Sequence, residues 1–405
     1  MTTNTPFLGK TSRSTLFISS LVFSAQASAV TNDSAIKALQ EQVQQMQAQV
    51  NILAKQTTSQ ENSRDFIERN TIFRSLFSGG SASPQKEQKL LNALKNDSVQ
   101  SGHIYLGAKA ETKIFYDTNE KSSGGNSASD FMSQAWFGVL TRMNDWFTFY
   151  AGFTAKTPSD DLKLKESYML FANPNKTPFY GIAGYKTVNF GYHPRYDFSI
   201  SQLTRVFDYG TATQIEGGYY GNGFFANITA FNGDNDAATN ANNITNFTGM
   251  VNYAFKKDNI SFNTGTSIIR AIDSTAKFAN GYSIQLADTS TPTPAVSTFA
   301  QAKIKLNSTQ TLEVFGEYVQ TTERYLNQYT RSWGAQSAFK FIAFKQKLKL
   351  AVSYSGLHVA NNSANQYTAS ISRGSKIIEI GLSYGYLSTQ QFDDNMLVTK
   401  ITGYF

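Results

Sequence analysis

The 405-residue sequence contains no cysteine, and it has only three histidines, His103, His193 and His358. After its first 30 residues it has no apolar run approaching the roughly 20 residues that a transmembrane helix needs, which excludes a helical membrane protein. Without cysteine the fold uses no disulfides, which fits an exported protein. No histidine stands within a recognisable nucleophile or base signature, so we expect no enzyme.

Charge also excludes some partners. The chain has 36 basic and 29 acidic residues, a formal charge of +7, but no basic cluster or recognition-helix pattern, so nucleic acid is not an expected partner. The asparagine- and aspartate-rich stretch 232–243 lacks the ordered ligand spacing of a calcium loop. We therefore predict no metal and no cofactor.

The N-terminus has the three parts of a secretory signal. Lys10 and Arg13 form a basic stretch, residues 16–23 form an apolar run, and Ala27-Ser28-Ala29 is a small-residue cleavage site. The alternative, a membrane anchor, is disfavoured because two serines interrupt a short apolar run. Residues 1–29 are predicted to be a signal peptide.

Residues 30–60 have apolar side chains at alternating spacings of three and four. This heptad pattern predicts a periplasmic coiled-coil helix that forms a homo-oligomer; one amphipathic helix lying on another surface is the alternative. The seam consists of Ile36, Leu39, Val43, Met46, Val50 and Leu53. Residues 61–100 are expected to be a helical or flexible connector, with a break at 79–81 and a short helix from Pro84 to Lys95.

From about residue 101 the period changes to two. Ile104 and Leu106 alternate with Tyr105 and polar neighbours, and the pattern recurs along the chain to residue 405. Alternation of this kind is typical of transmembrane barrel strands, although a soluble sandwich shows it too. A sandwich of this size would need two domains, and no linker divides this region.

Connection lengths indicate the strand number. We count seven short turns, near residues 144–145, 173–177, 222, 256–258, 307–308, 345–346 and 373–375. We count eight longer connections, near residues 118–130, 157–161, 191–210, 233–243, 272–295, 323–330, 359–365 and 389–394. The fold class is therefore all-β: a transmembrane antiparallel β-barrel of about 16 strands over residues 101–405, preceded by the N-terminal helical segment.

The last nine residues of the sequence resemble a segment of a known protein family. Residues 397–405 alternate in polarity and end on Phe405, which resembles the closing strand of bacterial outer-membrane barrels. The resemblance implies recognition by the barrel-assembly machinery and contact with outer-membrane lipid and lipopolysaccharide. Aromatics beside short turns, such as Trp146, Phe147 and Phe179, fit an interfacial girdle, although all β-proteins are rich in aromatics.

Lysines predominate on the less apolar, inward face of the expected strands. The predicted pore-lining, anion-contacting residues are Lys109, Lys113, Arg142, Lys163, Lys165, Lys186, Lys303, Lys305 and Lys349, to which Lys156, Lys340 and Lys400 are added. The opposing acids are Glu111, Glu216, Glu313, Glu317 and Glu379. A lumen with more positive charge favours anions. The alternative is that lysines near strand ends face lipid headgroups or solvent.

The connection 191–210 resembles, by position and composition, the third external loop of general porins, which folds into the lumen. The resemblance implies a constriction that includes His193, Arg195, Asp197 and Arg205. Its arginines are suited to holding carboxylates. The alternative is a surface loop in which arginine and aspartate pair with one another.

The whole layout resembles outer-membrane porins with a periplasmic coiled coil, most like the LbtU-type siderophore porin family. That resemblance implies uptake of a carboxylate-type ferric siderophore. A general, dicarboxylate or anion diffusion porin fits the layout equally, and a structural or adhesive barrel is the alternative of another class. The expected location is the bacterial outer membrane, with the N-terminal segment in the periplasm.

Overall fold

The computed structural model describes the β-rich region and the helix before it. The predicted signal peptide, the coiled-coil seam and Arg195 lie outside the described residues. Those described are 76, 83–117, 128–157, 161–194, 197, 199–233, 243–272, 275–277, 283–286, 292–343, 346–360, 362–375, 377–390 and 393–405.

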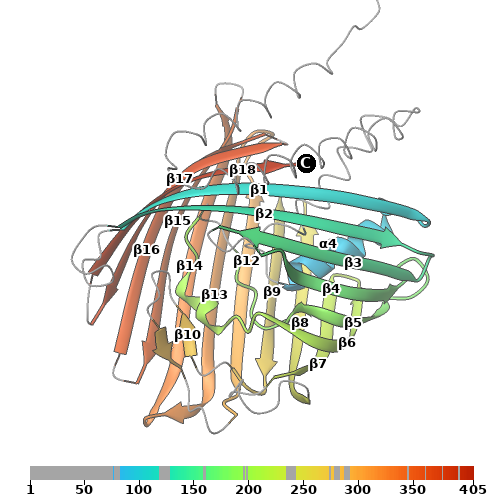
Figure 1. Cartoon of the computed structure of the whole chain (residues 1–405), viewed down its shortest axis with the longest axis horizontal. Helices are drawn as coiled ribbons and strands as arrows, with labels where there is room; N and C mark the ends of the chain where they lie inside the picture. Colours follow the sequence, from blue (N-terminus) through green and yellow to red (C-terminus); the bar gives the residue numbers. More distant parts are fainter. Residues whose placement is uncertain are drawn as a thin grey trace, which may run out of the picture. The chain divides into compact units, whose positions relative to one another are not determined.

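Within that part of the chain, sixteen antiparallel strands form a closed barrel (Figure 1). Each strand pairs with the next along the chain and β1 pairs with β18, except that β9 pairs directly with β12 because β10 and β11 form a separate two-stranded sheet. The bounds are β1 His103–Asp117, β2 Ala128–Arg142, β3 Phe147–Lys156, β4 Lys163–Ala172, β5 Phe179–Thr187, β6 Thr211–Gly221, β7 Phe224–Asn232, β8 Ile244–Lys257, β9 Ile260–Ile269, β10 Thr275–Lys277, β11 Ser283–Gln285, β12 Ala295–Lys305, β13 Thr311–Tyr325, β14 Gln328–Ala343, β15 Gln346–Val359, β16 Asn362–Gly374, β17 Ile378–Thr389 and β18 Asp393–Tyr404. The predicted fold class and strand number are confirmed.

Alternation in the sequence determines which face each strand turns outward. On β1, Ile104 is 69% exposed and Leu106 is 46% exposed, whereas Tyr105 between them is 5% exposed. Exposed apolar side chains on the outer face are what a lipid-facing barrel requires. Phe405, half exposed, pairs its backbone with Ala108, so it extends the β1–β18 seam that closes the barrel.

The predicted connection lengths are wrong in three places. All seven short turns lie where expected, but three of the eight connections expected to be long are tight hairpins. Leu326 and Asn327 alone join β13 to β14, both with positive φ, as a two-residue hairpin turn requires. Two residues join β15 to β16 and three join β17 to β18. Polar ends of these long strands, which run beyond the apolar band, had the composition of loops.

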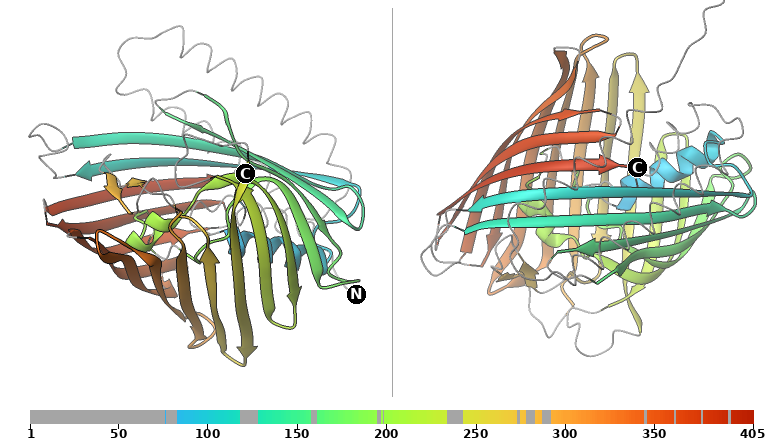
Figure 2. Two further views of the ribbon diagram at one scale, coloured as in Figure 1. Left: turned by 90° about the horizontal axis from the view of Figure 1, so that it is seen from below. Right: turned by 45° about the horizontal axis from the view of Figure 1, so that its top comes forward.

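Helix α4, Ser83–Lys95, confirms the predicted short helix. Pro84 suits its first turn, and Asp97, at φ 52°, ends it in the left-handed conformation. Its buried leucines, Leu90, Leu91 and Leu94, belong to one hydrophobic cluster with inward side chains of β1–β8. The helix therefore packs against the inner wall of the barrel (Figure 2). None of the described helices is long and apolar enough to cross a membrane.

Candidate functional site

A buried charge cluster holds α4 to the wall. Glu87 on α4 and Lys186 on β5 form an ion pair with each side chain 2% exposed, and Lys186 Nζ lies 3.3 Å from Glu216 on β6. Asn189 Nδ2 donates to both Glu87 oxygens, at 3.0 and 3.1 Å, and Tyr180 donates to Glu87 and Glu216. Buried ions that are paired and hydrogen-bonded in this way fix one geometry.

This cluster corrects one predicted anion contact. Lys186 points inward, as its strand position predicts, but it lies beneath α4 between two carboxylates and does not face open lumen. The prediction failed because alternation along a strand shows which face a side chain occupies, and not what covers it.

Arg142 is a second correction. It is 5% exposed, its Nη1 donates to the Val99 carbonyl at 2.8 Å, and it lies 3.4 Å from Asp97 and 3.8 Å from Asp145. It therefore anchors the segment after α4 to the β2–β3 turn. Arginine is suited to such a place because its fork can bond a carbonyl and carboxylates together.

The β5–β6 connection, residues 188–210, runs into the lumen and contains the short helix η2, Leu203–Phe207. Its backbone bonds to inward side chains of three strands: Gly191 N to Ser267 Oγ at 2.9 Å, Tyr192 N to Glu317 at 2.7 Å and Leu203 N to Ser355 Oγ at 3.1 Å. The described residues of this connection therefore lie against inward-facing side chains of the wall.

Within the loop, the predicted residues have different partners. His193 Nδ1 lies 2.7 Å from Glu317, and both side chains are buried. Arg205 pairs with Asp208 at 3.2 Å, as the surface-pairing alternative expected for arginine. Asp197 uses Oδ1 to accept the backbone N–H groups of Ser199 and Ile200, and it borders the central cavity. The described part of the loop is thus braced internally and against the wall.

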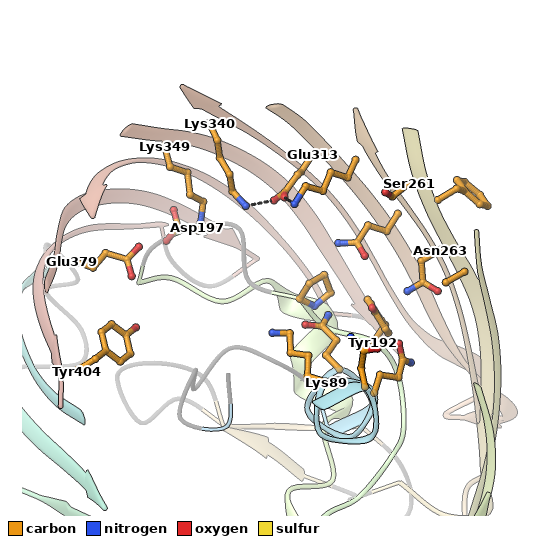
Figure 3. Close-up of a pocket in the computed structure, with 18 of the residues that line it drawn as sticks. Lys89, Tyr192, Asp197, Ser261, Asn263, Glu313, Lys340, Lys349, Glu379 and Tyr404 are labelled. Atoms are coloured by element: carbon orange, nitrogen blue, oxygen red, sulfur yellow. Dashed lines mark ion pairs between the residues drawn. The ribbon is translucent and has the colours of Figure 1, made fainter. Parts of the chain in front are cut away.

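Between α4, the loop and the wall lies a cavity of about 930 Å³. Its described lining carries eight lysines against four carboxylates, an excess of four positive charges. We call six of these lysines, which lie on β1, β12, β14, β15 and β18, the lysine wall: Lys109, Lys113, Lys303, Lys340, Lys349 and Lys400. Figure 3 shows Lys340 and Lys349 on this wall, with Glu313 and Asp197 nearby and Lys89 of α4 across the cavity.

Like charges lie directly opposite one another in this wall. Lys340 pairs in register with Lys349, and Lys113 with Lys400, on adjacent strands. Such pairs destabilise a sheet unless anions separate them. Glu313 pairs with one member of the first pair, lying 2.7 Å from Lys340, and it also lies 3.3 Å from Lys303.

At the β1–β18 end of the lysine wall, Glu111 lies between opposed lysines. It lies 2.9 Å from Lys109, 3.0 Å from Lys113 and 3.9 Å from Lys400. Each carboxylate is therefore shared by two or three ammonium groups, which leaves positive charge in excess.

Four other predicted lysines do not belong to the described lining of this cavity: Lys156, Lys163, Lys165 and Lys305. Lys165 is the extra residue of the bulge between β3 and β4, and Lys305 ends β12 beside a short turn. All four are exposed. Their exposure agrees better with the alternative that lysines near strand ends face lipid headgroups or solvent than with a contact to the central cavity.

Sequence reasoning missed the α4 side of the cavity. Gln85, Gln88, Lys89 and Asn92 line it, and Glu87 anchors the helix from the opposite side. Positions 85, 88, 89 and 92 follow the i, i+3, i+4, i+7 spacing of one helical face, a signal present in the sequence. In the described part of the chain, no group of acidic or histidine residues is arranged to hold a metal ion.

The His193–Glu317 pair predicts a pH dependence of the loop. Burial alone would lower the pKa of His193, but the Glu317 carboxylate outweighs it and raises that pKa above its usual value. The charged pair is thus complete below pH about 6.5, and its contribution is lost as the pH rises through the raised pKa. We expect the amides of Tyr192 and His193 to lose hydrogen-exchange protection above that pKa, after correction for intrinsic exchange rates.

His193→Gln should show no such pH-dependent loss, because glutamine does not titrate. The matched control is His358→Gln, at a ring that contacts Gln328 at 2.6 Å outside this loop and should leave the wild-type profile in place. Equal protection across the pH range in the wild type would contradict the assignment.

No protein-family model and no curated protein matches this sequence. Solved structures do. OmpT of Vibrio cholerae, folded in vitro and in its trimer form, aligns with a TM-score of 0.54 and 10% identity over 76% of this chain and 100% of that chain. An anion-selective porin from Comamonas acidovorans aligns with a TM-score of 0.52 and 11% identity, over 75% and 99% of the two chains.

OprB of Pseudomonas putida gives a TM-score of 0.53 and 10% identity over 75% of this chain and 94% of that chain. At identities this low, the similarity concerns the fold and says nothing about function. The chain has the barrel fold of outer-membrane porins.

Proposed function

We propose that this protein is an outer-membrane porin whose water-filled channel favours anions. The observation that carries the proposal is the cavity inside the barrel, where eight lysines face four carboxylates. A sixteen-stranded barrel is wide enough for an aqueous path, and positive charge within low-dielectric walls concentrates anions and repels cations. We assign no enzymatic activity.

Charge inside the barrel is divided between two regions. Beneath α4, Lys186 is balanced by Glu87 and Glu216, and Lys86 lies 3.5 Å from Glu166. In the cavity, Lys349 and Lys89 have no ion-pair partner within 4 Å among the described residues. The surplus of positive charge thus lies where solute has access.

Two elements narrow this path. Helix α4 packs on the inner face of β1–β8, and described residues of the 188–210 loop attach to inward side chains of β9, β13 and β15. The cavity lies between these two elements and the lysine wall. The proposal therefore includes a size limit as well as a charge preference.

Three N-terminal segments and the partners of the protein are predicted from the sequence alone. These are the signal peptide 1–29, the periplasmic coiled coil 30–60 as a route to a homo-oligomer, and the connector 61–100. Barrel-assembly machinery, lipid and lipopolysaccharide are the expected partners at the membrane. The barrel fold supports the outer-membrane location.

Charge preference is tested by Lys340→Gln with Lys349→Gln. Removing two ammonium groups also releases Glu313 from its closest partner, so we expect the anion-to-cation permeability ratio to fall by about two- to fivefold. The measurement is the reversal potential of single channels in a potassium chloride gradient. The matched control is Lys347→Gln, which removes a lysine of β15, the strand of Lys349, that lies outside the described cavity lining. Cation preference in the wild type would refute the proposed function.

The size limit is tested by Glu87→Gln. The variant leaves Lys186 paired with Glu216 alone, and loss of the charge-assisted contacts that Glu87 makes to Lys186 and Asn189 costs on the order of 2 kcal/mol. We expect α4 to loosen and single-channel conductance to rise. Glu323→Gln, at an exposed position of β13, is the control. A gel shift on boiling should show both variants still folded, and unchanged conductance would mean that α4 does not limit the path.

The family resemblance of the sequence also suggests a larger anion as the cargo, a carboxylate-type ferric siderophore. Cavities of several hundred cubic ångströms hold ligands of that size class, and a ferric polycarboxylate is anionic. If it is the cargo, deletion of the gene should reduce growth on the ferric polycarboxylate as sole iron source. A dicarboxylate or general anion porin would instead change small-solute permeability and leave iron supply untouched; a structural or adhesive barrel would change neither.

A further inference from the structure

The central cavity has two unlike sides. On one side is the lysine wall, and on the other is the polar face of α4, with Gln85, Gln88 and Asn92 beside Lys89. Asn263 on β9 and Gln301 on β12 continue this second side, as Figure 3 shows for Asn263. We call these five amide side chains the amide wall. The lysine wall alone would suffice for an anion channel, so the amide wall must have another role.

Part of the amide wall lacks hydrogen-bond partners. Gln88 Nε2 and Asn263 Oδ1 are shielded from solvent and bond to no group among the described residues. A buried polar atom without a partner costs free energy, so such atoms in a native fold indicate a binding role or strain. Amides both donate and accept, which matches the hydroxyl group.

Aromatic rings lie between the polar groups. Trp136, Tyr192, Tyr220 and Phe262 border the same cavity, and Lys109 Nζ lies 4.0 Å from the centre of the Trp136 ring. One face of the Tyr192 ring stacks on Phe299, with 4.1 Å between centroids, so the surface that these rings turn to the cavity is what remains to pack against carbon-bound hydrogens, while amides bond the oxygens of the same molecule. A simple inorganic anion would make no use of them.

The two walls are close enough to act on one molecule. Lys89 of α4 and Lys340 of the lysine wall line the same cavity, and Figure 3 shows them on opposite sides of it. Lys349 lies in register beside Lys340 on the lysine wall. One negative group placed among these lysines would relieve the repulsion between them.

Resting on the proposed anion channel, we propose that this cavity is a binding site for small polyhydroxylated anions, such as sugar acids. The anionic group binds Lys340 and Lys349, and the hydroxyl groups bind Gln85, Gln88 and Asn92 of α4. The helix is thus a recognition surface, in addition to narrowing the path. A ligand that lacks either the charge or the hydroxyl groups engages only one wall.

Three probes separate these contributions in single-channel recordings at constant ionic strength. Gluconate carries both features, acetate has the charge without hydroxyl groups, and sorbitol has the hydroxyl groups without the charge. We expect gluconate to reduce the current at concentrations about tenfold lower than either other probe, because each wall adds hydrogen bonds to one molecule. Equal potency of acetate or of sorbitol would overturn the proposal.

Two variants assign the walls. Gln88→Ala should raise the half-blocking concentration of gluconate by about tenfold, whereas Gln100→Ala, exposed just after α4, should not. Lys349→Gln should weaken gluconate block and Lys347→Gln should not. If Gln88→Ala and Gln100→Ala behave alike, α4 is not part of a binding site.

These outcomes are separate from those of the channel proposal. Wild-type reversal potential in potassium chloride reports the charge preference without gluconate. An anion-selective channel that gluconate fails to block would overturn the binding site alone, whereas a cation-selective channel would remove its basis as well. A gel shift on boiling verifies that each variant is folded.

Discussion

The structure depends on one constraint: in lipid, every backbone N–H and C=O group must find its hydrogen-bond partner within the protein. Strands satisfy this requirement only when the sheet has no free edge, and the β1–β18 pairing removes the edge here. Closure then creates an interior that the sequence must fill or leave open to water. The alternating strands, the inserted helix and the folded-in loop all follow from that requirement.

The interior is filled in two chemically distinct ways. Where α4 packs on the wall, apolar and tyrosine side chains surround a group of ions in which each ammonium group has a carboxylate partner. Where the interior stays open, ammonium groups outnumber carboxylates and like charges lie in adjacent register positions. A fold optimised for stability alone would not place Lys340 beside Lys349. The uneven distribution of charge indicates that the open part of the interior keeps a positive electrostatic potential at a cost in folding stability.

Much of this was accessible from the sequence, and the rest was not, for identifiable reasons. Alternation placed both Lys186 and Lys349 on the inward face, and both do point inward. Only packing distinguishes them, because Lys186 meets a carboxylate that lies 99 positions earlier in the chain. The strand number was correct because short turns have a local signature, whereas the Leu326–Asn327 turn was hidden among polar strand ends. The amide face of α4 was readable by its spacing but lay in a segment expected to be a connector.

The Glu87–Lys186–Glu216 cluster also orders the formation of the molecule. Helix α4 precedes β1 in the chain, yet the side chains that bond to Glu87 are Tyr180 and Lys186 of β5 and Asn189 of the segment after it. Glu87 can leave water at low cost only when these partners are in place, so stable docking of α4 requires that β5 is already positioned in the wall. Docking of α4 therefore depends on a strand that lies about 100 residues away in sequence.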